Sequence, residues 1–241
     1  MTRVRIIADD FKPKNPIVIE GFQGFGLVGV IAAEYLADKF NMRQVGHIES
    51  NALPAMALLI NGEVKFPIRI FADDKNELVV FDSELPIPQH LAYDIAKEIA
   101  EWAEKNNARQ IICLEGLAVP TTPQESNVYG IANSKELEEK IKKKVKIIDN
   151  GIIIGVSAAL LLECQSRNIP AICLMAECHS EFPDGRAAVS VLRALSDLLN
   201  LKLDVSPLEK EALEAQKKIK SIIEKAKKIG EVGEKPERIY G

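Results

Sequence analysis

The chain has 241 residues, of which 47% are hydrophobic and 27% are charged, the balance of a globular protein with a core of its own. A net charge of −4 argues against general nucleic-acid binding, which needs clustered lysine and arginine. No apolar run reaches the roughly 18 residues of a membrane span, and no signal peptide is evident. We therefore expect a cytoplasmic protein whose partners are neither nucleic acids nor membranes.

Short β-rich runs alternate with amphipathic helices through the first part of the chain, so residues 1–205 predict one α/β domain. A buried strand is expected over residues 17–20. A glycine-rich turn follows it, and then come a helix over residues 27–40 and a strand over residues 43–49.

Three β-rich runs come next, over residues 56–60, 64–71 and 78–81. Asn61 and Gly62 separate the first two runs, and Asn-Gly between apolar runs is a strong hairpin signal. We therefore expect an antiparallel meander here instead of a βαβ crossover.

Helices and strands alternate again from Pro88 onward. The expected elements are a helix over 88–106, a strand over 111–114, a helix over 135–144 capped by Ser134, a strand over 152–154, a helix over 157–167, a strand over 170–175 and a helix over 185–200. Together the elements predict a three-layer α/β sandwich, in which helices cover both faces of a mixed sheet.

The composition changes near residue 206. Residues 207–241 hold 9 Lys+Arg against 7 Asp+Glu, so this arm is net positive, whereas the preceding residues hold 22 against 28. Ser206 as N-cap and Pro207 at the first helical position predict a helix start. Gly230 predicts its end, so we expect a C-terminal heptad helix over 206–229 and a flexible tail over 230–241.

Apolar residues recur along this helix at spacings of four and three, a heptad stripe about 33 Å long. The stripe consists of Leu208, Ala212, Ala215, Ile219, Ile222, Ala226 and Ile229. It packs either on the helix's own domain or between subunits as an oligomer interface. The lysines between residues 217 and 228 are expected to form a solvated face, because the apolar side carries no Trp or Phe.

Gly24, Gly26 and Gly29 match the G-x-G-x-x-G pattern of dinucleotide-binding loops, and Glu49 follows in the position of a ribose-binding acid. The loop starts late after its strand, however, and a meander follows it where a βαβαβ unit would continue. We therefore expect no cofactor, and glycines that let a helix pack closely on the sheet. The alternative is a nucleotide- or nucleoside-binding enzyme that uses these three glycines.

Other residue types that carry chemistry do not form a recognisable site. The four cysteines are too scattered for a disulfide scaffold or a zinc site, and buried free thiols are expected at Cys113, Cys164, Cys173 and Cys178. The acids considered for a catalytic pair are expected to be solvated or salt-bridged, and they are Glu115, Glu163, Glu177 and Asp184. No G-x-S-x-G elbow is present. The sequence therefore predicts no catalytic residue, no metal and no enzyme.

The chain ends in Ile239, Tyr240 and Gly241. A hydrophobic residue, then Tyr, then any last residue is the ending that proteasome activators insert into pockets of the 20S α-ring. A Tyr ring can fill such a pocket, its hydroxyl can find a partner there, and the terminal carboxylate can pair with a lysine. We expect these three residues to bind the protein partner.

Several segments resemble the proteasome assembly chaperone 2 family, over about residues 15–200. The segments that carry the resemblance are residues 19–22, 26–29, 115–116, 154–160 and 183–188. The C-terminal helix and the Ile239–Gly241 ending resemble the archaeal homologues in particular. The resemblance implies a nucleoside-phosphorylase-like three-layer fold, no demonstrated catalysis and a homo-oligomer such as a tetramer or pentamer. It also implies docking of the tail on 20S proteasome α subunits or on a related chaperone-like protein.

Overall fold

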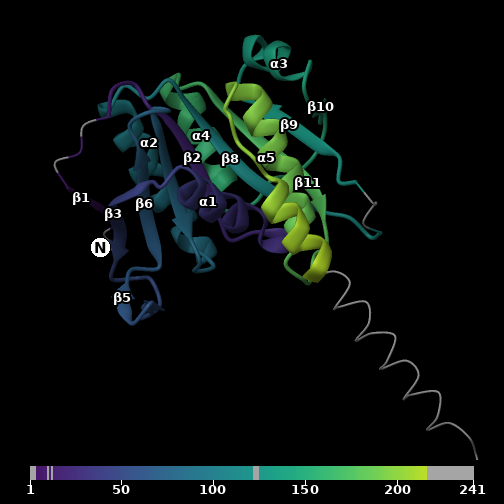
Figure 1. Cartoon of the computed structure of the whole chain (residues 1–241). Helices are drawn as coiled ribbons and strands as arrows, with labels where there is room; N and C mark the ends of the chain where they lie inside the picture. The colour runs from purple at the N-terminus through teal and green to yellow at the C-terminus, as the bar shows by residue number, and fades with distance from the viewer. Residues whose placement is uncertain (1–3, 10, 12, 122–124, 216–241) are drawn as a thin grey trace, which may run out of the picture.

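The computed structural model describes residues 4–9, 11, 13–121 and 125–215 (Figure 1). Its strands are β1 (Val4–Ala8), β2 (Ile17–Phe22), β3 (Arg43–Ser50), β4 (Leu58–Ile60), β5 (Glu63–Lys65), β6 (Ile68–Asp73), β7 (Leu78–Ser83), β8 (Gln110–Ala118), β9 (Val128–Ala132), β10 (Lys146–Ile147) and β11 (Ala171–Cys178). Its helices are α1 (Val28–Lys39), α2 (Ala92–Lys105), α3 (Lys135–Ile141), α4 (Val156–Arg167) and α5 (Gly185–Leu199), and the short 3-10 turns are η1 (Phe25–Leu27) and η2 (Gln89–Leu91).

One mixed sheet forms the middle of the domain. Among the described residues it has nine strands in the order β1-β3-β6-β7-β2-β8-β11-β9-β10. Its four central strands, β7, β2, β8 and β11, run parallel to one another. They are almost continuously apolar, as expected for strands that helices cover on both faces.

Helices cover both faces of the sheet, with α2 and α4 on one face and α1 and α5 on the other (Figure 1). Side chains such as Val18 and Ile111 point toward α2 and α4 and form one core. Their sequence neighbours Ile19 and Ile112 point toward α1 and α5 and form the second core, because side chains alternate along a strand. The predicted three-layer sandwich with a mixed sheet is confirmed.

The predicted hairpin is present, but the predicted meander is only partly correct. Asn61 and Gly62 adopt positive φ angles of 51° and 82°, as a two-residue hairpin turn requires, and they join β4 to β5. The run over residues 64–71 is broken at Pro67, which has no N–H to donate to a ladder. As a result β4 and β5 form a separate hairpin, and the rest of the second run, β6, pairs antiparallel with β7 in the main sheet.

The expected strand over residues 152–154 is wrong. These residues have no strand partner, and Ile152 and Ile154 are 93% and 64% exposed. The segment leads into α4 through Gly155, whose φ of 87° suits glycine. Three strands were missing from the sequence-based prediction, namely β1, β9 and the two-residue β10; β1 and β10 lie at the two ends of the sheet.

The start of the C-terminal arm lies on α5. Residues 206–215 are helical, and Asp204 Oδ1 accepts a 3.0 Å hydrogen bond from the Ser206 backbone N–H, so Asp204 makes the capping contact expected of Ser206. Residues 216–241 lie outside the described residues, so the boundaries 206–229 and 230–241 stay predictions. None of the helices in the described ranges is long and apolar enough to cross a membrane.

Candidate functional site

The glycine-rich loop between β2 and α1 is packed against the sheet. A Cβ atom at Gly29 would lie 2.5 Å from the Leu114 carbonyl oxygen, and one at Gly24 would collide with the Glu115 carboxyl group. Gly26 adopts a φ of +61°, and its carbonyl accepts a 2.8 Å hydrogen bond from the Asp184 N–H. All three glycines therefore face protein atoms, which supports the expectation that they serve close packing.

Beneath this loop, the carboxyl ends of β2 and β8 present two glutamates to the first turn of α4. Glu20 follows Val18 on the face of β2 that points toward α4, and Glu115 follows Cys113 on the same face of β8. The Ser157 hydroxyl oxygen lies 2.8 Å from Glu20 Oε2 and 2.6 Å from Glu115 Oε1. Glu20 is fully buried, whereas Glu115 is partly exposed. We call Glu20, Glu115 and Ser157 the carboxyl cluster.

Burial dominates the electrostatics of the carboxyl cluster. It raises the pKa of Glu20, against the opposing effect of hydrogen bonds from Ser157, Cys113 and the Phe22 N–H. Burial and the neighbouring charge of Glu20 raise the pKa of Glu115 to about 8. The carboxyl ends of parallel strands are where α/β folds place binding sites, so this is the strongest candidate for chemistry in the described part of the chain.

A second cluster of carboxylates surrounds Arg69 on β6. Its Nη2 lies 2.7 Å from Asp82 Oδ2, 2.6 Å from Glu84 Oε1 and 3.4 Å from Glu34 Oε1. The three acids approach closely enough to hold a metal ion. The guanidinium group already supplies a cation at their centre, so the arrangement is an ion-pair network. Burial raises the pKa of Asp82 to about 7, although Arg69 opposes that rise.

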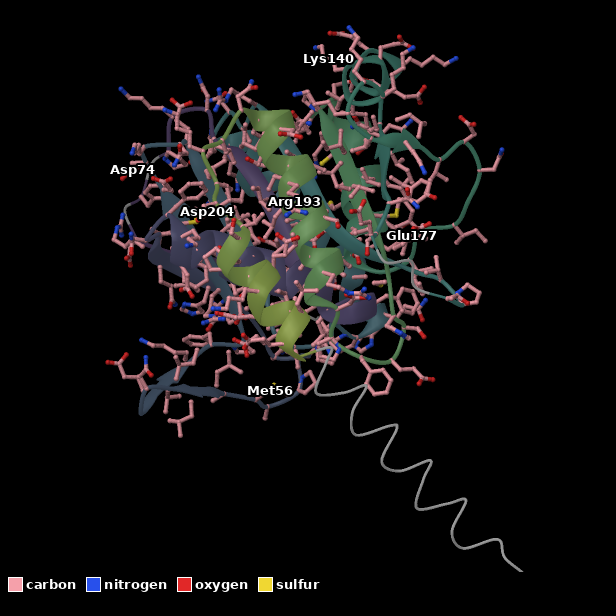
Figure 2. The ribbon with its side chains drawn as sticks, turned by 45° about the vertical axis from the view of Figure 1, so that its right-hand side comes forward. Met56, Asp74, Lys140, Glu177, Arg193 and Asp204 are labelled. Atoms are coloured by element: carbon pink, nitrogen blue, oxygen red, sulfur yellow. The ribbon has the colours of Figure 1, made fainter. Side chains whose placement is uncertain are left out.

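The described start of the arm packs on its own domain. Leu208 contacts the core formed by α1 and α5, and a Cβ atom at Gly185 would lie 2.9 Å from the Cβ of Ala212. Arg193 on α5, which is labelled in Figure 2, forms a 2.6 Å ion pair with Glu209. A groove of about 810 Å³ runs beside this contact and is lined partly by Leu213.

The structure describes only the first three residues of the apolar stripe. Leu208 and Ala212 are half-buried within the subunit, and Ala215 is exposed. Ile219, Ile222, Ala226 and Ile229 lie outside the described residues, as do the tail residues Ile239, Tyr240 and Gly241. Their interface and partner-binding roles stay predictions.

The structure separates most of the acids that the sequence suggested. Glu177 accepts hydrogen bonds from Asn127 and Tyr129, and Asp184 caps α5. Glu163 forms an ion pair with Arg167 on α4. Of the four acids that the sequence suggested, only Glu115 lies close to another acid, through their shared contact with Ser157. Its partner Glu20 was missed, although a glutamate within the apolar run of β2 was a signal for it.

The cysteine prediction is confirmed. All four cysteines are free and buried. Cys178 lies next to His179 in sequence, but within the described ranges the acids around Arg69 are the only group of three or more acid, histidine or cysteine side chains that could hold a metal ion.

The fold and the arm define a class: a three-layer α/β domain that continues into a C-terminal helix docked on α5. The sequence profile of the PAC2 family matches residues 18–223, and the chain belongs to this family. The Methanocaldococcus jannaschii protein MJ1210 is 31% identical over 241 residues, a match that covers 96% of this chain and 92% of the relative.

Solved structures agree with this assignment. The structure of Pyrococcus furiosus PbaA, an archaeal homolog of proteasome-assembly chaperone, matches with a TM-score of 0.86 and 31% identity, covering 96% of each chain. Pyrococcus furiosus PbaB, an archaeal proteasome activator, matches with a TM-score of 0.80 and 25% identity, covering 92% of this chain and 99% of PbaB. The protein is therefore related to archaeal homologues of proteasome-assembly chaperones, as the resemblance in sequence indicated.

Proposed function

We propose that this protein is a non-enzymatic, homo-oligomeric proteasome-interacting protein. It docks its C-terminal tails on a protein partner, which we take to be the α-ring of the 20S proteasome. Membership of the PAC2 family and the similarity to PbaA and PbaB support a role with the proteasome. The observation that carries the proposed mode of binding is the ending Ile239-Tyr240-Gly241.

The length of the arm suits this role. Ala215 is the last described residue of the arm, and 26 further residues follow it. If residues 216–229 continue the helix and the tail is extended, the chain end reaches about 60 Å from Ala215. A tail on such a tether can reach a pocket on a large partner while the α/β domain stays outside.

Several tails on one oligomer would strengthen a contact that is weak for each tail alone. A Tyr side chain and a terminal carboxylate bury little surface, so a single tail is expected to dissociate readily. Once one tail is bound, the others experience a high effective concentration of pockets on the same ring.

Packing of the glycine-rich loop argues against the enzyme alternative. A dinucleotide needs close approach to the loop backbone, but the faces of Gly24, Gly26 and Gly29 contact β8 and β11. A thermal-shift screen with NAD, ATP and nucleosides tests the alternative, because binding to the native state raises the melting temperature. We expect no shift.

The proposal is tested by a pull-down with purified 20S particles. The full chain is compared with a chain that lacks residues 239–241, with Tyr240→Ala, and with Glu234→Gln as a matched control in the tail. We expect at least tenfold weaker binding for the first two variants, no change for the control, and the same oligomer by light scattering for all. Equal binding of the truncated chain would show that the tail is not the docking element.

A further inference from the structure

The carboxyl cluster contains more hydrogen-bond acceptors than donors. Ser157 Oγ is within hydrogen-bond distance of both glutamates, at 2.8 Å from Glu20 and 2.6 Å from Glu115. A serine hydroxyl has one hydrogen to donate, and an ionised carboxylate has none. With both glutamates ionised, one of these two short contacts would join two acceptors.

We propose that Glu20, Glu115 and Ser157 form a binding site for one proton, which the folded protein retains at neutral pH. With that proton present, one carboxyl group donates to the Ser157 oxygen, and the Ser157 hydroxyl donates to the other carboxylate. Both short contacts then become hydrogen bonds. The proton belongs to the pair of carboxyl groups rather than to either glutamate alone.

The surroundings of the pair provide hydrogen-bond donors, among them the Cys113 thiol, but the described residues provide no cation that could replace the proton. The thiols of Cys113 and Cys173 lie close by, from β8 and β11, and burial keeps their pKa values well above the usual range. Cys178, at the end of β11, has its pKa raised to about 12 by burial and by the charges of Asp184 and Glu115. Cys164 on α4, near Cys113, has its pKa raised to about 12. Within the described residues, no lysine, arginine or histidine is paired with Glu20 or Glu115.

The site ties together three elements that the chain places far apart. Glu20 belongs to β2, Glu115 to β8 and Ser157 to α4. The glycine-rich loop lies directly over Glu115 at Gly24, and the same loop accepts the Asp184 hydrogen bond at the start of α5. Loss of the proton would leave two negatively charged carboxylates in contact with the Ser157 hydroxyl oxygen, where β2, β8 and α4 meet.

The sign of the pH dependence follows from the proton count. Unfolded glutamates have pKa values near 4.3, so above about pH 5.5 the unfolded chain has released this proton while the folded chain retains it. The folding equilibrium then falls by up to tenfold for each pH unit, until the folded pair also ionises near the pKa of about 8 at Glu115.

The test compares denaturant unfolding of the full chain between pH 5.5 and 7.5 with that of the double variant Glu20→Gln/Glu115→Gln. The Gln side chains keep the shape and supply amide donors but do not titrate. Glu211→Gln, on the exposed side of the arm helix, is the matched control. We expect the control to behave as wild type, and the pH dependence of the double variant to be smaller by about one proton.

Infrared spectroscopy at pH 7 provides a second readout that does not depend on folding energetics. A protonated carboxyl group has a carbonyl band separate from that of carboxylate, and we expect wild type to show it. Asp82, whose pKa is also raised to about 7, contributes to this band, so the carboxyl cluster is read from the difference between wild type and the double variant, or Glu115→Gln if the double variant does not fold. We expect that difference to contain the carboxyl band. Absence of the band from that difference at pH 7, or equal pH dependence in wild type and the double variant, would overturn the proposal.

Discussion

Replacement of Arg69 by methionine should be among the most damaging single changes to the sheet. Arg69 and Asp82 face each other on β6 and β7, and their side chains are 9% and 0% exposed. Methionine keeps much of the length of the side chain but removes the charge. It would leave the Asp82 carboxylate buried beside Glu34 and Glu84, without the cation that now lies among them.

The magnitude follows from the burial of each pair. Removing one partner of a buried ion pair costs about 3–5 kcal/mol, and the Arg69–Asp82 pair is of this kind. Glu84 and Glu34 have side chains that are 32% and 47% exposed, so their contacts add under about 1 kcal/mol each. At about 2–4 °C per kcal/mol for a chain of this size, the melting temperature should fall by about 6–20 °C.

Acid should reduce this loss. Wild type already retains a proton on Asp82 up to about pH 7, and without the guanidinium the pKa of Asp82 rises further, so only the variant keeps that proton above neutral pH. Stability of Arg69→Met therefore falls as pH rises from about 4 through neutral, and the deficit relative to wild type is smaller at pH 5 than at pH 8.

Denaturant titrations at the two pH values measure both effects. Arg5→Met is the matched control, because Arg5 pairs with Glu49 on the same sheet but its side chain is 52% exposed, and we expect a change under about 1 kcal/mol. A loss below 1 kcal/mol for Arg69→Met at pH 8, or an equal loss at pH 5, would refute the reasoning.

Two further experiments test the loop and the arm. Gly29→Ala should destabilise the protein by about 1–3 kcal/mol, because its Cβ would lie 2.5 Å from the Leu114 carbonyl oxygen and α1 would have to move. Gly151→Ala is the matched control, because a Cβ atom at Gly151 would lie 3.6 Å from Cγ2 of Ile148, an ordinary contact distance. It should change stability by under about 0.5 kcal/mol in the same denaturation assay. Ile219→Asp with Ile222→Asp should yield smaller species in light scattering if the stripe lies between subunits, at a cost of several kcal/mol. An unchanged oligomer would place the stripe within the subunit or in solvent.

Periodicity predicted the helices and central strands well because their burial is encoded locally. The apolar positions of α2 recur at helical spacing, and β2, β8 and β11 each begin with or contain an apolar run of at least three residues before a single glutamate. The failed strand over residues 152–154 has the same apolar character, but Ile152 and Ile154 face solvent and only Ile153 packs against the core. A local pattern reports which side chains are apolar, whereas tertiary packing decides whether a strand partner is available.

The carboxyl cluster could not be predicted from the sequence for a similar reason. Glu20 and Ser157 are 137 residues apart, and they meet only because β2 pairs with β8 and α4 covers that pair. Pairing of Glu20 with Cys113 in the sheet places Glu115 two residues further along the same face. The local signal was a charged residue within a buried strand, and the missing information was the order of the strands.

The position of the arm on α5 supports the interpretation that the stripe packs on its own domain for Leu208 and Ala212 only. Leu208 and Ala212 pack within the subunit, and Ala212 already lies at Gly185, the first residue of α5. If the helix continues as the sequence predicts, Ile219 lies about 10 Å beyond Ala212, past the end of the helix that supports the arm. The first part of the stripe anchors the arm to its own domain, and we predict that the part from Ile219 onward packs on a different surface. A second subunit can provide that surface, which would join neighbouring arms and set several tails on one assembly.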